Sequence, residues 1–153
     1  MFHRHPFLSL MTFVYLGFVG WLTLTPGSEA PTGSAVVLRV VARLQVYDTR
    51  FTYDRVEFLA NVGLFVPVGV FLVLLFGSRL WWVAVFAGFL MTSAIETAQR
   101  AIPGRVPDDR DVLSNTMGTL IGVALALVLT FPATLRRHRA RKRREALAPT
   151  LSR

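Results

Sequence analysis

The sequence predicts an all-α integral membrane protein, a bundle of four transmembrane helices. Of its 153 residues, 53% are hydrophobic, and the mean hydropathy is +0.49, which is above the usual range of soluble domains. The apolar residues also gather in runs with almost no charges. An apolar run of about 18 to 20 residues can cross a bilayer as a helix. We find four such runs, at about 7–25, 58–76, 80–96 and 112–131.

The first run could instead be a secretory signal. Arg4 precedes it, and Ser28, Glu29 and Ala30 resemble a small-residue cleavage site. Its apolar core is longer than the roughly 7 to 15 residues of a signal peptide, so we expect it to remain as a membrane span. The third run is the shortest, and it needs Glu96 and its neighbours to complete a crossing.

The charges predict the orientation of the bundle. With four spans, both termini share one side with the turn after the second span, and that side holds ten Lys and Arg against one acid, a net charge of +9. The opposite side holds seven Arg against eight acids, a net charge of −1. Positive residues near span ends stay in the cytoplasm. We therefore expect both termini to be cytoplasmic, and the loops 26–57 and 99–111 to face outward.

Seven of the ten cations lie in the run RRHRARKRR, 136–144. This run divides the chain into a transmembrane domain, 1–135, and a basic cytoplasmic tail, 136–153. The run lacks interleaved aromatic residues and follows a span closely. We therefore interpret it as a topology anchor that contacts anionic lipid, and we predict no nucleic-acid partner.

The first outer loop contains an amphipathic segment. Apolar residues recur at helical spacing, whereas Arg39 and Arg43 share another face. The apolar residues are Val37, Val40, Val41 and Leu44. This pattern is typical of a short helix lying on the membrane surface. The many β-branched residues leave a strand as the alternative.

Three spans carry a polar residue at one depth. Asn61 and Asn115 each lie three residues past the start of a run that enters from outside, and Glu96 ends the run that leaves toward the outside. At about 1.5 Å of rise per residue, the three side chains fall just inside the outer leaflet. The spacing 3, 4, 3, 4 also puts a further set on one helix face: Asp108, Asp111, Asn115, Gly118 and Gly122.

Two further features lie close to these residues. Pro67 has no amide hydrogen and leaves the carbonyl of Gly63 without its helical partner, which predicts a bend near Asn61. A turn marked by proline and glycine is flanked by three polar side chains, which brings arginine close to the acids: Gln99, Arg100 and Arg105.

Each polar residue also has a purely structural interpretation. Asp108, directly after a proline, is a good helix N-cap. Gly118 and Gly122 form a GxxxG pattern, which is typical of close helix packing. Asn61 and Asn115 could bond to each other.

Glu96 could reach water with Arg100 as its partner four residues on. The convergence of a carboxylate, two amides and an arginine at one depth in lipid is costly. It favours a shallow outward-facing pocket. Its predicted ligand-binding residues are Asn61, Glu96, Gln99, Arg105, Asp108, Asp111 and Asn115, with Pro67, Gly69, Gly118 and Gly122 as structural residues.

The composition argues against several kinds of chemistry. The chain has no cysteine, and its three histidines lie at 3, 5 and 138 in the tails. Thiolate metal sites are excluded, and Ser-His or Cys-His nucleophiles are poorly supported. We predict no cofactor and no metal. As an alternative, Glu96, Asp108, Asp111 and the Asn115 oxygen are the kind of ligands that a hard divalent cation prefers.

The series of polar residues resembles the VanZ-like family of small bacterial membrane proteins. The resemblance covers nearly the whole chain up to Phe131, including the WLTLTP that closes the first span, and rests on Asn61, Phe65, Pro67, Gly69, Ile95, Glu96, Gln99, Arg105, Asp108, Asp111, Asn115, Gly118 and Gly122. It implies a multi-pass protein of the bacterial plasma membrane. The namesake of the family is associated with low-level resistance to the glycopeptide teicoplanin. No reaction or cofactor comes with the name.

Our first functional hypothesis is a non-enzymatic membrane factor that binds an envelope lipid, or the lipid tail of a lipoglycopeptide. Arg100 and Arg105 would bind a phosphate or carboxylate, and Asn61, Gln99 and Asn115 would bind a polar headgroup. Three alternatives remain open. They are a metal-dependent enzyme acting on a lipid-linked substrate, a proton-coupled transporter subunit that forms a homo-oligomer, and a purely structural subunit.

Overall fold

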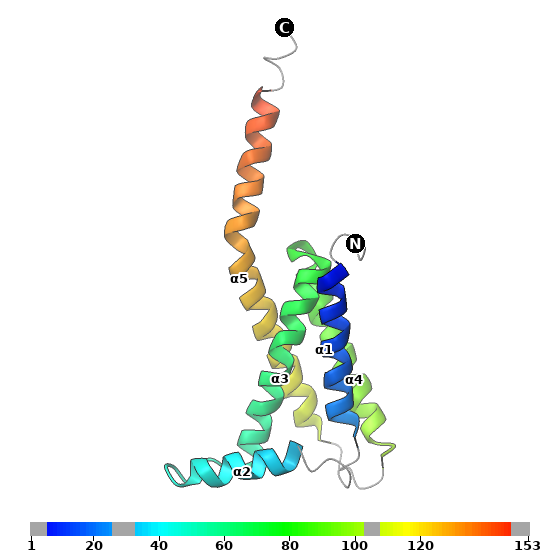
Figure 1. Ribbon diagram of the computed structural model, residues 1–153, viewed down its shortest axis with the longest axis vertical. Coiled ribbons are helices and arrows are strands. Elements are labelled where there is room, and N and C mark those ends of the chain that lie inside the picture. Colours follow the sequence, from blue (N-terminus) through cyan, green and yellow to red (C-terminus); the bar gives the residue numbers. More distant parts are fainter. Residues whose placement is uncertain (1–5, 26–32, 103–107, 148–153) are drawn as a thin grey trace.

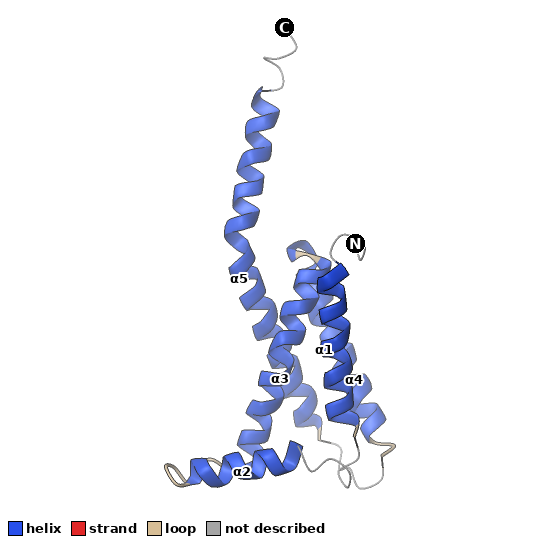
Figure 2. Cartoon of the chain, in the orientation of Figure 1, coloured by secondary structure: helices blue, strands red, loops and turns tan. Residues whose placement is uncertain are grey.

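The computed structural model describes residues 6–25, 33–102 and 108–147, and throughout these residues the regular structure is helical, with no strand. Figure 2 shows this directly. The elements are α1 (Pro6–Leu24), α2 (Gly33–Gln45), α3 (Tyr53–Phe76), a short 3₁₀ helix η2 (Ser78–Leu80), α4 (Trp81–Gln99) and α5 (Asp109–Leu147).

Four of these segments are long and apolar enough to cross a membrane: Pro6–Leu24, Tyr53–Phe76, Ser78–Gln99 and Asp109–Phe131. Many of their large apolar side chains are exposed, among them Phe13, Phe18 and Leu129. In water such a surface would be costly, whereas lipid tails are as apolar as these side chains. The predicted all-α membrane bundle is therefore confirmed.

The four long helices alternate in direction (Figure 1). α1 and α4 run from the upper to the lower end of the bundle in this view, and α3 and α5 run back. The connections after α1 and after α4 therefore leave the bundle at the same end, as the sequence predicted for loops 26–57 and 99–111. We call this the loop end. Which side of the membrane the loop end faces stays a prediction from the charges.

α2 lies across the loop end rather than along the bundle (Figure 1). It is a helix, so the strand alternative is wrong. Val41 is buried and α2 contacts α3, whereas Arg39 and Arg43 are exposed. Val41 thus turns toward the protein and the arginines away from it, whereas Val40 of the same apolar stripe is exposed. A helix with one apolar and one basic face is typical of a membrane surface.

α3 and α5 make the most extensive helix contact in the bundle, and glycines make it possible. A Cβ atom at Gly118 would overlap the carbonyl oxygen of Val62, and one at Gly122 would overlap that of Val66. Gly69 on α3 meets the backbone of α5 in the same way. Small residues of this kind let two helix backbones approach closely. The GxxxG face is therefore covered within the chain, which removes it as a surface for forming oligomers.

The helices extend beyond the apolar runs. α3 begins at Tyr53 rather than 58, and α4 ends at Gln99 rather than 96. α5 begins at Asp109 and continues past the end of its span to Leu147. Pro67 lies inside α3, and the helix continues beyond it to Phe76. Hydropathy locates the part of a helix that lies in lipid, but the helix itself continues where its side chains can be polar.

Candidate functional site

Polar side chains from α3, α4 and α5 meet near the loop end of the bundle. The side-chain amide of Asn61 donates from Nδ2 to Oδ1 of Asp111 at 2.8 Å. The amide of Asn115 donates from Nδ2 to Oγ1 of Thr92 at 2.9 Å. Both bonds join different helices. We call the set formed by Asn61, Thr92, Glu96, Gln99, Asp111 and Asn115 the polar layer.

Gln99 connects the polar layer to α1. Its Nε2 donates to the backbone carbonyl of Thr23 at 2.8 Å. Thr23 lies in the last turn of α1, where backbone carbonyls have no partner within the helix, so a buried amide on α4 satisfies one of them. All four membrane-crossing helices are therefore tied together at this level by hydrogen bonds.

Glu96, on α4 between Thr92 and Gln99, is only 4% exposed. It follows Thr92 by one helical turn and so lies on the same face of α4. Neither of its carboxyl oxygens has a hydrogen-bond partner. Nε of Arg100 is 3.9 Å from Oε1, which is too long for a hydrogen bond. The Arg100 side chain is 58% exposed and is shared with Asp109 at 3.7 Å.

The charges around Glu96 are mainly negative. Asp111, Asp109 and Asp108 all act on its carboxyl group electrostatically, against Arg100 as the opposing cation. Asp109 is itself almost fully exposed. Glu96 is therefore a buried acid beside other acids, and its arginine partner lies mostly in solvent.

Two more buried oxygens lack a partner. Oδ1 of Asn115, a residue that is 5% exposed, accepts no hydrogen bond, and Oγ1 of Thr116 makes none. Leaving such a group unsatisfied costs about 1–3 kcal/mol, and unsatisfied buried groups are rare in native proteins. Within the polar layer, the unsatisfied atoms of Glu96 and Asn115 are all oxygens.

The structure places the other predicted site residues differently. Asp108 is exposed, and its Oδ1 accepts from the backbone N–H of Arg110 at 2.9 Å. This is the geometry of a helix N-cap, so Asp108 caps α5 and does not lie in the polar layer. The alternative of a hydrogen bond between Asn61 and Asn115 is not seen. Asn61 donates to Asp111, Asn115 donates to Thr92, and Oδ1 of Asn115 accepts no bond. Arg105 lies outside the described residues.

The metal alternative gains no support from the geometry. Among the described residues, no group of three or more His, Cys, Asp or Glu side chains is placed to hold a metal ion. Asp108, one of the four proposed ligands, is used as a cap. Of the two remaining acids, Asp111 on α5 accepts a hydrogen bond from Asn61. Glu96 lies on another helix, α4.

Two contributors to this region were not predicted. Thr92 accepts the bond from Asn115, and the carbonyl of Thr23 accepts the bond from Gln99. A signal for Thr92 was present, since Gly88, Thr92 and Glu96 follow each other at intervals of four and so share one helix face. The Thr23 carbonyl had no such signal.

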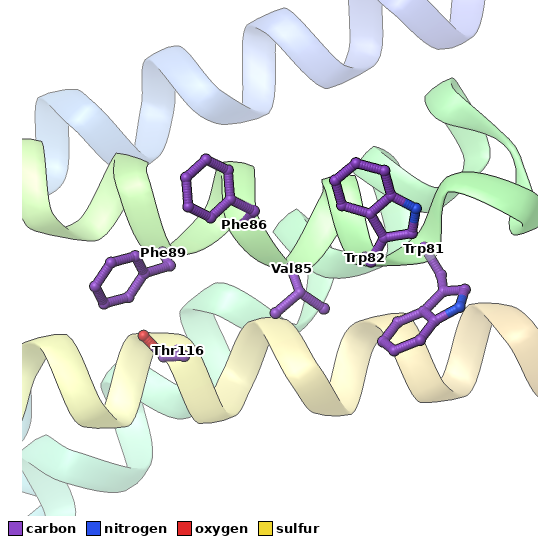
Figure 3. A pocket seen from close by; sticks show the side chains of 6 residues that line it. All are labelled: Trp81, Trp82, Val85, Phe86, Phe89 and Thr116. Carbon is purple, nitrogen blue, oxygen red and sulfur yellow. The ribbon is translucent and has the colours of Figure 1, made fainter.

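A separate apolar groove of about 550 Å³ lies between α4 and α5 (Figure 3). It is lined by Trp81, Trp82, Val85, Phe86, Phe89 and Thr116. The groove occupies the half of α4 farther from the loop end, and it shares no residue with the polar layer. Figure 3 shows the Thr116 side chain pointing into the space between the two helices. Its apolar lining suits a hydrocarbon chain rather than a polar group.

Four membrane-crossing helices joined near one end by a buried polar layer define a small multi-pass membrane protein. The chain belongs to the VanZ/LLP1 family, whose sequence model matches residues 12–130. This confirms the resemblance seen in the sequence. The match begins in α1 and ends with the span of α5, so it includes the whole polar layer and leaves out the basic run. No curated protein and no solved structure gives a significant match.

Proposed function

We propose that this protein binds an amphiphilic envelope molecule, a lipid or a lipoglycopeptide, at the outer face of the bacterial plasma membrane. Through that binding it would contribute to resistance against glycopeptides such as teicoplanin. The observation that carries this proposal is the pair of buried residues in the polar layer, Glu96 and Asn115, whose oxygens have no partner in the protein. A ligand would supply the missing hydrogen bonds.

The surroundings of these oxygens are suited to binding. Three hydrogen bonds between helices, made by Asn61, Gln99 and Asn115, fix the neighbouring side chains. Binding groups are effective when a second set of contacts holds them in place. A site with this support loses little side-chain freedom when a ligand arrives.

The depth of the layer suits an amphiphile. Glu96 lies three residues before the end of α4, about 4.5 Å from the helix end at the rise of an α-helix. A side chain this close to the end of a membrane-crossing helix would be within reach of a lipid headgroup. The charge distribution in the sequence favours an outward orientation of this end, and the outer face is where a glycopeptide would be met.

The test is the growth-inhibitory concentration of teicoplanin in a susceptible host that expresses the wild type or a variant at matched membrane levels. Vancomycin, which carries no acyl tail, is measured alongside. We expect protection by the wild type and its loss in Glu96→Gln and Asp111→Asn. Glu57→Gln is the matched control, because Glu57 is an acid near the same end that already accepts a bond from Tyr53.

The outcomes separate the alternatives. If Glu96→Gln and Asp111→Asn protect as well as the wild type, the polar layer only holds the bundle together and the binding proposal is wrong. If the wild type itself gives no protection, the role in glycopeptide resistance is wrong for this protein.

A further inference from the structure

In the polar layer, the buried side-chain atoms that have no hydrogen-bond partner are all oxygens. Each of its three amide side chains, Asn61, Gln99 and Asn115, uses an N–H group within the protein. The atoms left without a partner are Oε1 and Oε2 of Glu96 and Oδ1 of Asn115. An ionised carboxylate only accepts hydrogen bonds, and a protonated one still keeps an accepting oxygen, as does an amide carbonyl. A ligand that completes this set must therefore donate hydrogen bonds.

The charges point the same way. An anionic headgroup would bring further acceptors and a second negative charge beside Glu96, where Asp111 and Asp109 already act on the carboxyl group. Like charges repel more strongly in a buried site than in water. Arg100, the described cation that could offset this, points largely into solvent and is already shared between Glu96 and Asp109. The geometry thus disfavours the phosphate or carboxylate head that the arginines suggested in the sequence.

A primary ammonium group has the complementary chemistry. It carries three N–H donors and a compact positive charge, and the layer offers three unsatisfied oxygens on two residues that are both more than nine-tenths buried. Hydrogen bonds between charged partners are roughly twice as strong as neutral ones. A quaternary ammonium carries the same charge with no donor, which makes the two chemistries separable.

We infer that the amphiphile recognised by this protein presents a primary ammonium group to Glu96 and Asn115. This inference rests on the proposed function. Its hydrocarbon part remains in the surrounding lipid. The hydrogen bond that the Asn115 amide donates to Oγ1 of Thr92 sets the direction in which the Asn115 carbonyl points, so Thr92 acts as a positioning residue for the site.

The experiment uses the full-length ¹⁵N-labelled protein in nanodiscs of phosphatidylcholine, a lipid whose head has no N–H donor. Three single-chain probes of equal length are titrated: dodecylamine, dodecyltrimethylammonium and dodecanoate. The side-chain amide signals of Asn115 report occupancy of the site. We expect dodecylamine to bind about tenfold more tightly than dodecyltrimethylammonium, the ratio that one charge-assisted hydrogen bond supports, and we expect dodecanoate to bind weakest.

Variants locate the effect. Glu96→Gln should lose the preference for dodecylamine, whereas the control Glu57→Gln should keep it. Should Glu96→Gln fail to fold, the three probes on the wild-type protein still decide the question.

Each outcome has one meaning. Equal binding of the two cations would overturn the need for a donor, and tighter binding of dodecanoate would overturn the cation preference. Both of these results leave the proposed binding of an amphiphile standing. If none of the probes shifts the Asn115 signals, the inference and the proposed binding site fail together.

Discussion

Asn115 shows how a polar residue is accommodated inside a membrane span. An unpaired amide is expensive at this depth, and here its N–H donates to Thr92 on the neighbouring helix. The same bond leaves its carbonyl oxygen unpaired. The N–H group of this side chain therefore joins two helices, whereas its carbonyl oxygen is free to bind a ligand. The two groups can be tested separately.

Removing the acceptor should destabilise the protein. We expect Thr92→Val, which keeps the shape of the side chain, to lower the free energy of unfolding by about 1 kcal/mol, because the buried Asn115 N–H loses its partner. Thr97→Val is the control, since Thr97 is exposed and bonds to the carbonyl of Ser93 in its own helix. Unfolding in mixed detergent micelles gives both values. Equal stabilities would show that Asn115 finds another partner.

The sequence predicted the depth of the polar residues but not their pairing. Depth follows from the fixed rise of a helix, so Asn61, Glu96 and Asn115 could be placed at one level from their positions alone. Pairing depends on how far each helix is rotated about its own axis, which the sequence does not state. Thr92 was missed because threonine in an apolar helix commonly bonds to its own backbone, as Thr12 does here.

At the scale of the elements, the crossing of α3 and α5 depends on glycine. Replacing glycine by alanine inside a helix normally favours the helix by about 1 kcal/mol. At Gly122 the added methyl group would overlap the carbonyl of Val66, whereas at Gly63 nothing lies within 4 Å of it. An alanine should therefore lower the free energy of unfolding at position 122 but not at position 63.

We expect Gly122→Ala to destabilise the bundle by about 1–3 kcal/mol, the usual cost of overpacking, and Gly63→Ala to be neutral or stabilising. Unfolding of both variants and of the wild type in the same detergent tests this. A stabilising effect at Gly122 would mean that α3 and α5 can separate without loss.

The extent of each element was only partly predictable. The apolar runs located the spans. The stripe of Val37, Val40, Val41 and Leu44 indicated a short amphipathic helix, and the structure has the helix α2 there. The helix ends were missed because hydropathy falls where a helix leaves the lipid, whereas the helix itself can continue further with polar side chains. The first turns of α3 and α5 carry Asp54, Asp109 and Asp111, which are favourable near a helix N-terminus, so both helices start before their apolar runs.

At the scale of the whole molecule, the lack of cysteine makes the topology easy to test. Tyr47 follows α2 at the loop end and is 88% exposed, and Arg79 is exposed in η2 at the opposite end. In spheroplasts, a membrane-impermeant maleimide should label Tyr47→Cys directly and Arg79→Cys only after lysis, as the charge distribution predicts. The unaltered chain, which has no thiol, is the control. The reverse pattern would place the polar layer in the cytoplasmic half of the membrane.

α5 continues beyond its span into the basic run as one helix, and Pro132 follows directly after the last residue of that span. A proline within a helix leaves the carbonyl four residues earlier, here that of Val128, without its hydrogen bond. Bending of a long helix is concentrated at such a position. We therefore expect any bend of α5 to occur at Pro132, where it would change the direction of the basic run and leave the part of α5 that carries Asp111 and Asn115 in place.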